Sequence, residues 1–117
     1  MNTSHSDKEL LKHIIDEMDF LVRNTSSINE VEGLVKDEIL TRACIRSLEI
    51  IGEAVKKISP ELRNQNPGME WKSMAGMRDK LIHHYFDVDY ELVWDVIKNK
   101  IPNLANDLKE ILKKQNP

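Results

Sequence analysis

Apolar residues recur at the spacing of an α-helix through every long segment of this 117-residue sequence. Positions three and four residues apart lie on one face of a helix, so each such segment must bury that face against another element. No segment shows the alternation of apolar and polar residues that marks a half-buried strand, and there is no internal repeat or low-complexity tract. The pattern predicts an all-α fold, an up-and-down bundle of four principal helices in one domain covering residues 1–117.

Capping patterns and helix breakers place the four principal helices along the chain. The first is expected from about residue 7 to 23, behind the capping box Ser6-Asp7-Lys8-Glu9. The second is expected from about 37 to 58, and the third from about 70 to 82 or a little beyond. The last should kink or split at Pro102, because proline removes one backbone hydrogen bond and clashes with the preceding turn.

Two shorter helical pieces are expected between these segments. Ser27 and Glu30 offer a second capping box, which predicts a short helix that ends near Gly33. Ser59-Pro60-Glu61 predicts the start of another, since proline is favoured in a first helical turn.

The expected core consists of the apolar residues that repeat at helical spacing. They are Leu10, Leu11, Ile14, Ile15, Met18, Leu21 and Val22 in the first helix; Ile39, Leu40, Ala43, Cys44, Leu48, Ile51, Val55 and Ile58 in the second; Trp71, Met74, Met77 and Leu81 in the third; and Leu92, Val93, Val96, Ile97, Ile101, Leu104, Leu108, Ile111 and Leu112 in the last. Gly52 costs roughly 1 kcal/mol relative to alanine inside a helix, which predicts close packing against another helix there.

Composition limits the classes of function. The chain is 40% apolar and 32% charged, and its net charge of −3 argues against strong non-specific nucleic-acid binding by the bulk surface, though not against a small basic site. Cys44 is the only cysteine, which excludes an intrachain disulfide and a cysteine-rich zinc site, and it is expected to be a small buried hydrophobe. Neither a signal peptide nor a membrane span is apparent, so we expect a soluble, cytoplasmic protein.

The stretch Met77–Tyr90 is the chemically densest part of the sequence, because its residues 78–86 bring Arg78, Asp79, Lys80, two histidines and a tyrosine close together. On an ideal helix, Arg78 and Tyr85 are nearly eclipsed, whereas Arg78 and His83 point roughly 140° apart. For the side chains of Arg78 and His83 to converge, the helix must end or distort near His83, or the two side chains must reach one wide groove from both of its sides.

This set of side chains suits phosphoryl chemistry. A histidine with an ordinary pKa of about 6.5 can take and return protons at neutral pH. Arg78 presents a planar fork that matches phosphate oxygens, and Asp79 could orient the imidazole of His83. RNA cleavage of this kind needs no metal, because the neighbouring 2′-hydroxyl is the nucleophile.

Simpler interpretations remain open at this point. The histidine pair could serve only to interact with a helix dipole, and Tyr85 and Phe86 could only close the core. His83 and His84 cannot jointly chelate one metal from a regular helix, although a mixed Asp79/His83/Asp87 site has workable spacing.

A charged series on the second helix, Arg42, Arg46, Glu49 and Glu53, follows one helix face. It is either a solvated stripe of ion pairs, each worth a few tenths of a kcal/mol, or the wall of a groove that faces the Arg78–Tyr85 stretch.

Beyond these local readings, Arg78-Asp-Lys-Leu-Ile-His83-His-Tyr85 matches the pattern Arg-x4-His-x-Tyr and resembles the signature of HEPN-domain proteins of the HepT-like toxin family. Further segments resemble that family in the same order, from the first helix to the last: Arg46-Ser-Leu-Glu49-Ile-Ile-Gly52-Glu53-Ala54, Ser59-Pro60-Glu61-Leu62, Trp71, Gly76-Met77-Arg78, Tyr85-Phe86-Asp87-Val88-Asp89 and Val93-Trp94.

The resemblance implies an all-α HEPN bundle that forms a homodimer around a shared cleft. It implies a toxin that is a metal-independent endoribonuclease acting on tRNA or mRNA, without a cofactor. His83 would be the general acid and base, and Arg78 would bind the phosphate. Tyr85 would be the residue to which a partner antitoxin, a minimal nucleotidyltransferase, adds AMP. The alternatives are a HEPN subunit that binds nucleotide or RNA without cleaving it, and a structural partner with a vestigial motif.

Auxiliary roles follow from the same resemblance. Arg46, Glu49 and Glu53 would form a wall of the cleft, and Lys80 would add to its positive charge. His84 stands where many members of the family have a small residue, and we expect it to be auxiliary or merely tolerated. The roles of Asp79 and His84 stay open.

Overall fold

The computed structural model describes residues 6–82 and 87–115. Its elements in chain order are α1 (Asp7–Thr25), α2 (Val31–Lys36), α3 (Glu38–Lys56), α4 (Pro60–Gln65), α5 (Trp71–Ala75), α6 (Met77–Leu81), α7 (Tyr90–Asp95), the π-helical turn η1 (Val96–Lys100) and α8 (Ile101–Lys114). The predicted all-α class is confirmed in the described part of the chain, where the β-type pairing is one isolated bridge between Ile82 and Val88.

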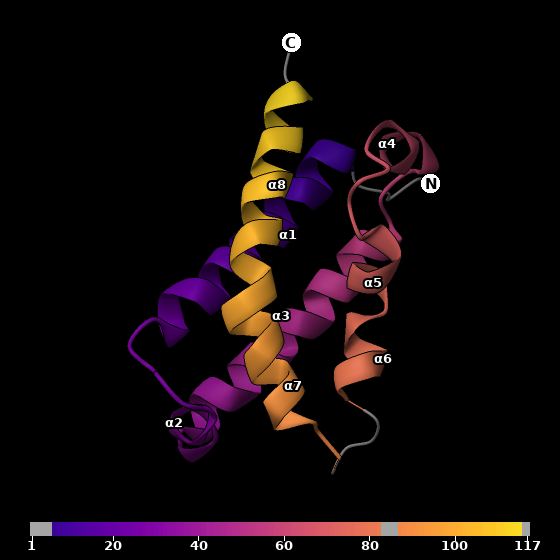
Figure 1. Cartoon of the computed structure of the whole chain (residues 1–117). Helices are drawn as coiled ribbons and strands as arrows, with labels where there is room; N and C mark the ends of the chain where they lie inside the picture. Colours follow the sequence, from indigo (N-terminus) through magenta and orange to yellow (C-terminus); the bar gives the residue numbers. More distant parts are fainter. Residues whose placement is uncertain (1–5, 83–86, 116–117) are drawn as a thin grey trace.

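Helix α3 lies at the centre of the arrangement. It packs against α1 on one side and against α5 and α6 on another, while α8 also packs against α1 (Figure 1). The molecule measures 44 × 28 × 25 Å along its principal axes. Because α3 contacts both the core helices and the segment that contains Arg78, it fixes the position of that segment relative to the bundle.

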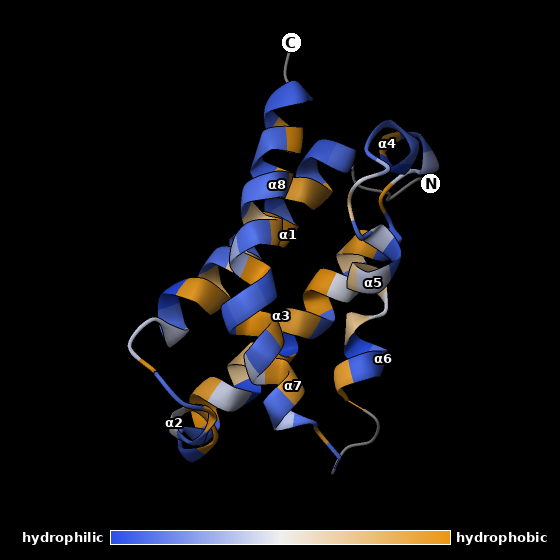
Figure 2. Cartoon of the chain, in the orientation of Figure 1, coloured by the Kyte–Doolittle hydropathy of each residue, from blue (hydrophilic) through white to orange (hydrophobic). Residues whose placement is uncertain are grey.

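The core contains most of the residues that the periodicity predicts. Leu11, Ile14, Leu48, Ile51 and Leu81 are fully buried, and the apolar stripes of the helices face inward while α8 presents a mainly hydrophilic outer face (Figure 2).

The prediction of a buried side chain is wrong at two residues, Ile39 and Val22. The side chain of Ile39 is 83% exposed, and Val22 is also at the surface. Ile39 lies five residues before Cys44, about 140° round the helix from the buried stripe, so its apolar side chain points outward.

The sequence predicted a continuous third principal helix, but the structure divides it into α5 and α6. Gly76 ends α5 with a ψ of 5°, and its N–H donates to the carbonyl of Lys72. Glycine is a poor helix former, so the break falls at this residue. Trp71, Met74 and Met77 are nonetheless buried as predicted.

The predicted capping box at Ser27 and Glu30 is also wrong. The residue that precedes α2 is Glu30, without a side-chain cap, and α2 continues past Gly33 to Lys36. A Cβ atom at Gly33 would approach the Cγ2 atom of Ile28 to 2.9 Å. Glycine here therefore allows the chain to fold closely over Ile28 rather than ending the helix.

Two other helix starts agree with the sequence. Ser6 and Glu9 form the predicted capping box of α1, and Ser59 caps α4. Asp89 caps α7. The last helix is divided just before Pro102 by η1, where the N–H of Ile101 donates to the carbonyl of Val96, five residues back. This wider turn is the irregularity that a proline in a helix demands.

Gly52 is a point of close helix packing, as predicted. A Cβ atom placed there would lie 3.2 Å from the carbonyl oxygen of Ala75 and 3.6 Å from that of Met74. Glycine at this position lets α3 approach the C-terminal end of α5, and the position of α5 in turn sets where α6 begins.

We expect Gly52→Ala to lower the free energy of unfolding by about 1 kcal/mol, because overpacking against a backbone carbonyl outweighs the gain in helix propensity. Urea unfolding would measure the loss. Gly68→Ala is the matched control, since a Cβ atom at Gly68 meets nothing within 4 Å. Equal stability of the two variants would contradict the packing assigned to Gly52.

Candidate functional site

Arg78 is presented to solvent by the short helix α6. Met77 and Leu81, four residues apart, are buried and hold the helix against the bundle. The side chains between them face outward, so the side chain of Arg78 is 51% exposed and that of Asp79 is 69% exposed. The amphipathic pattern of α6 therefore places a charged group at the surface, beside α3.

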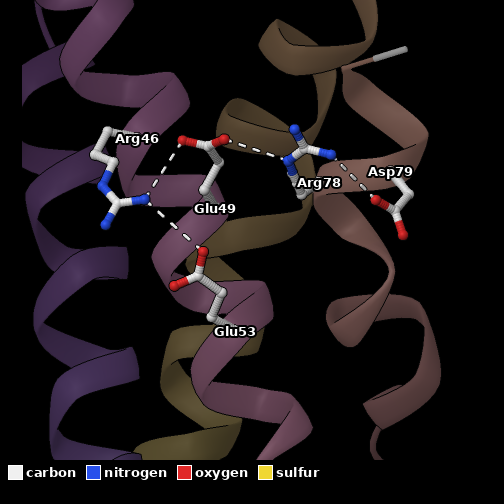
Figure 3. A network of polar contacts seen from close by, with 5 residues as sticks. All are labelled: Arg46, Glu49, Glu53, Arg78 and Asp79. Atoms are coloured by element: carbon white, nitrogen blue, oxygen red, sulfur yellow. Dashed lines mark hydrogen bonds and ion pairs between the residues drawn. The ribbon is translucent and has the colours of Figure 1, made fainter. Parts of the chain in front are cut away.

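A chain of ion pairs joins α3 to α6 (Figure 3). The Nε atom of Arg78 donates to the Oε2 atom of Glu49 at 3.3 Å, and its Nη1 atom lies 3.4 Å from the Oδ1 atom of Asp79. The Nη1 atom of Arg46 lies 3.6 Å from the Oε1 atom of Glu49 and 3.8 Å from the Oε2 atom of Glu53. Glu49 is thus held by an arginine on each side.

This ion-pair chain neutralises Arg78 in the free protein. The hydrogen bond to Glu49 raises the pKa of Arg78 above its ordinary value, and the hydrogen bond to Asp79 raises it further. The guanidinium group therefore stays charged at any physiological pH. Three carboxylates surround two guanidinium groups in this cluster, so an incoming anion must compete with a carboxylate for Arg78.

A groove of about 670 Å³ runs beside this cluster. Glu49 and Arg78 line one part of it, and Arg42 and Glu38, which form an ion pair at 3.9 Å, line another. The remaining lining residues are Val35, Thr41, Ile45, Ile82, Val88 and Tyr90. The groove thus combines charged groups from α3 and α6 with an apolar floor.

The described residues on either side of the histidine segment are firmly held. Ile82 and Val88 form an antiparallel bridge, and the N–H of Asp89 donates to the carbonyl of Leu81 at 3.1 Å. The predicted site residues His83, His84 and Tyr85 lie outside the described residues.

The predicted alignment of Arg78 with Tyr85 was drawn for one ideal helix, and Tyr85 lies outside the described residues. Helix α6 ends at Leu81, and Ile82 has an extended backbone with φ of −128° and ψ of 101°. The helical register that includes Arg78 and Asp79 therefore ends at Leu81. A helix that ends near His83 is what the convergence of Arg78 and His83 requires.

The charged series on α3 is divided, and two of its four members line the groove. Arg42 and Glu49 line the groove, and Glu49 contacts Arg78 directly. Arg46 and Glu53 belong to the ion-pair chain without lining the groove. Lys80 is exposed on α6.

Sequence reasoning missed most of the residues that line the groove, among them Val35 and Tyr90. Val35 belongs to α2, whose position beside α7 no local pattern shows. Tyr90 follows the cap residue Asp89 directly, and no periodic pattern in the sequence marks it as a groove residue.

Within residues 6–82 and 87–115, no group of three or more histidine, cysteine, aspartate or glutamate side chains could hold a metal ion. The mixed Asp79/His83/Asp87 site considered above includes His83, which lies outside this part of the chain. None of the helices in the described part is long and apolar enough to span a membrane.

Cys44 is a buried thiol, as predicted. Its side chain is inaccessible, and burial first and the charge of Asp37 second raise its pKa to about 11. The thiol is then protonated in the folded chain at pH values where the unfolded chain has already lost its proton.

We expect stability to fall as the pH rises from about 9 towards 11, because the unfolded state gains a thiolate that the folded state does not. Urea unfolding at several pH values would measure this loss. Cys44→Ala serves as the control, and it should show a smaller decline over the same range. An identical decline in both proteins would contradict the assignment.

The chain matches a family model described as "Ribonuclease HepT-like" over residues 11–111. It is 50% identical over 105 residues to "Putative RNase TTE0752" of Caldanaerobacter subterraneus subsp. tengcongensis, covering 90% of this chain and 93% of that protein. It is 38% identical over 113 residues to "Probable ribonuclease HepT" of Thermococcus cleftensis, covering 97% of this chain and all of that protein. No solved structure gives a significant match.

Proposed function

This chain belongs to the HepT-like ribonuclease family, and on that premise we propose that it is a metal-independent endoribonuclease that acts as the toxin of a toxin–antitoxin pair. The observation that best supports the proposal is the placement of Arg78. Its guanidinium group is half exposed at the edge of a groove, on a short helix that ends just before His83. Cleavage of a phosphodiester requires a cationic group that binds the phosphate and a group that transfers protons.

The proposed reaction uses the RNA itself as nucleophile. His83 removes the proton from a 2′-hydroxyl, whose oxygen attacks the adjacent phosphorus while the bond to the 5′-oxygen breaks. A proton returned by the imidazole neutralises the leaving 5′-oxygen. The products are a 2′,3′-cyclic phosphate and a 5′-hydroxyl, and Arg78 stabilises the negative charge on the phosphoryl oxygens.

We propose that the chain acts as a homodimer. Val35, Ile39 and Tyr90 are large apolar side chains at the surface, and Val35 and Tyr90 also line the groove. Exposed apolar residues that line a groove, as Val35 and Tyr90 do, are typical of a protein interface. A second copy there would let Arg78 and His83 of both chains serve one cleft, and it would add positive charge from Lys80.

Tyr85 is the proposed site of regulation. A minimal nucleotidyltransferase antitoxin would transfer AMP from ATP to the phenolic oxygen of Tyr85, with release of pyrophosphate. The added phosphate would lie seven residues from Arg78 in sequence and would block RNA by its bulk and its negative charge. The proposed substrate is tRNA or mRNA, recognised through its phosphates.

The proposal is tested by expressing the chain alone in a bacterial host. We expect growth to stop and cellular RNA to be cleaved, and His83→Ala to remove both effects. Co-expression with a nucleotidyltransferase encoded next to this chain should restore growth and add a mass of one or more AMP units at Tyr85. A harmless wild-type chain that still binds RNA would favour the non-catalytic subunit instead.

A further inference from the structure

The two carboxylates that contact Arg78 differ in how firmly they are held. The side chain of Glu49 is 24% exposed and is restrained from its other side by Arg46. That of Asp79 is 69% exposed, and among the described residues it forms an ion pair with Arg78 alone. An exposed pair of this kind contributes little and exchanges readily, whereas a carboxylate fixed by two arginines stays in place.

The three nitrogen atoms of the Arg78 guanidinium group differ in their hydrogen-bond partners. Its Nε atom donates to Glu49 and its Nη1 atom to Asp79, while its Nη2 atom forms no hydrogen bond or ion pair within residues 6–82 and 87–115. Arginine binds a phosphate through two parallel N–H groups, either from the side through Nε and Nη2 or end-on through Nη1 and Nη2. Glu49 occupies Nε and so blocks side-on binding. If Asp79 moved away, Nη1 would become available for end-on binding together with Nη2.

We propose that Glu49 is a positioning residue for Arg78 and that Asp79 is the partner that the RNA phosphate displaces. The phosphate then binds end-on through Nη1 and Nη2, while the contact from Nε to Glu49 fixes the plane and direction of the guanidinium group. This assignment rests on the proposed function for the identity of the anion, a phosphodiester of RNA.

The charges of the cluster support this division of roles. Glu49, Glu53 and Asp79 outnumber Arg46 and Arg78, so a phosphate that entered with all three carboxylates in place would meet an excess of negative charge. Outward rotation of Asp79 removes the carboxylate nearest to Nη1 and is open to solvent (Figure 3). Loss of Glu49 would instead leave Arg46 and Arg78 without their shared anchor.

The two carboxylates should therefore respond to mutation in opposite ways. We expect Asp79→Asn to strengthen binding of RNA by about threefold to tenfold, because a competing charge next to the phosphate is removed. We expect Glu49→Ala to lower kcat by about tenfold or more without raising KM, because a misdirected guanidinium stabilises the transition state poorly. Glu49→Gln retains an oxygen that accepts from Nε, and its kcat should stay within about threefold of wild type.

The experiment has two arms. Fluorescence anisotropy measures binding of a 2′-O-methylated oligoribonucleotide, which the protein cannot cleave because the nucleophile is blocked. Steady-state cleavage of the unmodified oligonucleotide gives kcat and KM. Glu110→Gln is the charge-matched control, since Glu110 pairs with Lys113 on α8, away from the groove. Circular dichroism confirms that each variant is folded.

Weaker RNA binding by Asp79→Asn, or equal kcat values for Glu49→Ala and Glu49→Gln, would overturn the assignment. If the wild-type protein binds the modified RNA but cleaves nothing, the proposed ribonuclease activity fails while the binding arm still decides the role of Asp79. If it binds no RNA at all, both proposals fail.

Discussion

Replacement of Arg78 by alanine is expected to lower kcat/KM for RNA cleavage by about 10²- to 10³-fold, the usual cost of removing one group that stabilises a developing oxyanion. The fold should be unaffected, because the side chain is half exposed and its ion pairs lie at the surface. Initial rates on a fluorogenic oligoribonucleotide measure the loss. Arg78→Lys should recover only part of the activity, since an ammonium group keeps the charge but not the planar fork.

The salt dependence of binding separates a phosphate contact from a general loss of charge. For Arg78→Ala, the slope of log Kd against log salt concentration should decrease by about one. Arg23→Ala removes the same charge from the last turn of α1, and it should leave both the slope and the rate at wild-type values. Equal effects of the two substitutions would contradict a specific role for Arg78.

The largest effect on stability is expected from Leu48→Ala. Leu48 is fully buried on α3, among the largest inaccessible side chains of the described core. Truncation of a buried leucine leaves a cavity and costs about 3 to 5 kcal/mol, a large part of the roughly 5 to 15 kcal/mol that stabilises a typical domain. Urea unfolding would measure this loss, and the midpoint of thermal unfolding should fall by more than about 10 °C.

The neighbouring residue supplies the control for Leu48. Glu49→Gln alters a side chain on the next position of the same helix, but one that faces the groove, so its effect on unfolding should stay within about 1 kcal/mol. Similar destabilisation by both substitutions would contradict the division of α3 into a core face and a groove face.

Periodicity predicted the buried faces of α1, α3 and α8 because burial of an apolar stripe is a property of one helix at a time. It failed at Ile39, where an apolar residue stands off the stripe, and at Gly76, where one weak helix former breaks a segment that is otherwise helical. Capping patterns also do not show the close approach of Gly33 to Ile28, at a position where α2 continues.

Only part of the candidate site was predictable from the sequence. Spacing placed Glu49 on a charged face of α3, and resemblance to the family singled out Arg78, but most residues that line the groove were not predicted. The pairing of Glu49 with Arg78 joins residues 29 apart in sequence, and it depends on how closely Gly52 lets α3 approach α5. Such a contact arises from the packing of helices, which no local pattern contains.

The most direct test of metal-independent RNA cleavage by His83 and Arg78 is incubation of the purified chain with RNA in excess EDTA, followed by mapping of the product ends. We expect cleavage at an undiminished rate with 2′,3′-cyclic phosphate and 5′-hydroxyl ends, none with His83→Ala, and a rate about 10²- to 10³-fold lower with Arg78→Ala. Loss of cleavage in EDTA, or full cleavage by either variant, would contradict the proposed mechanism.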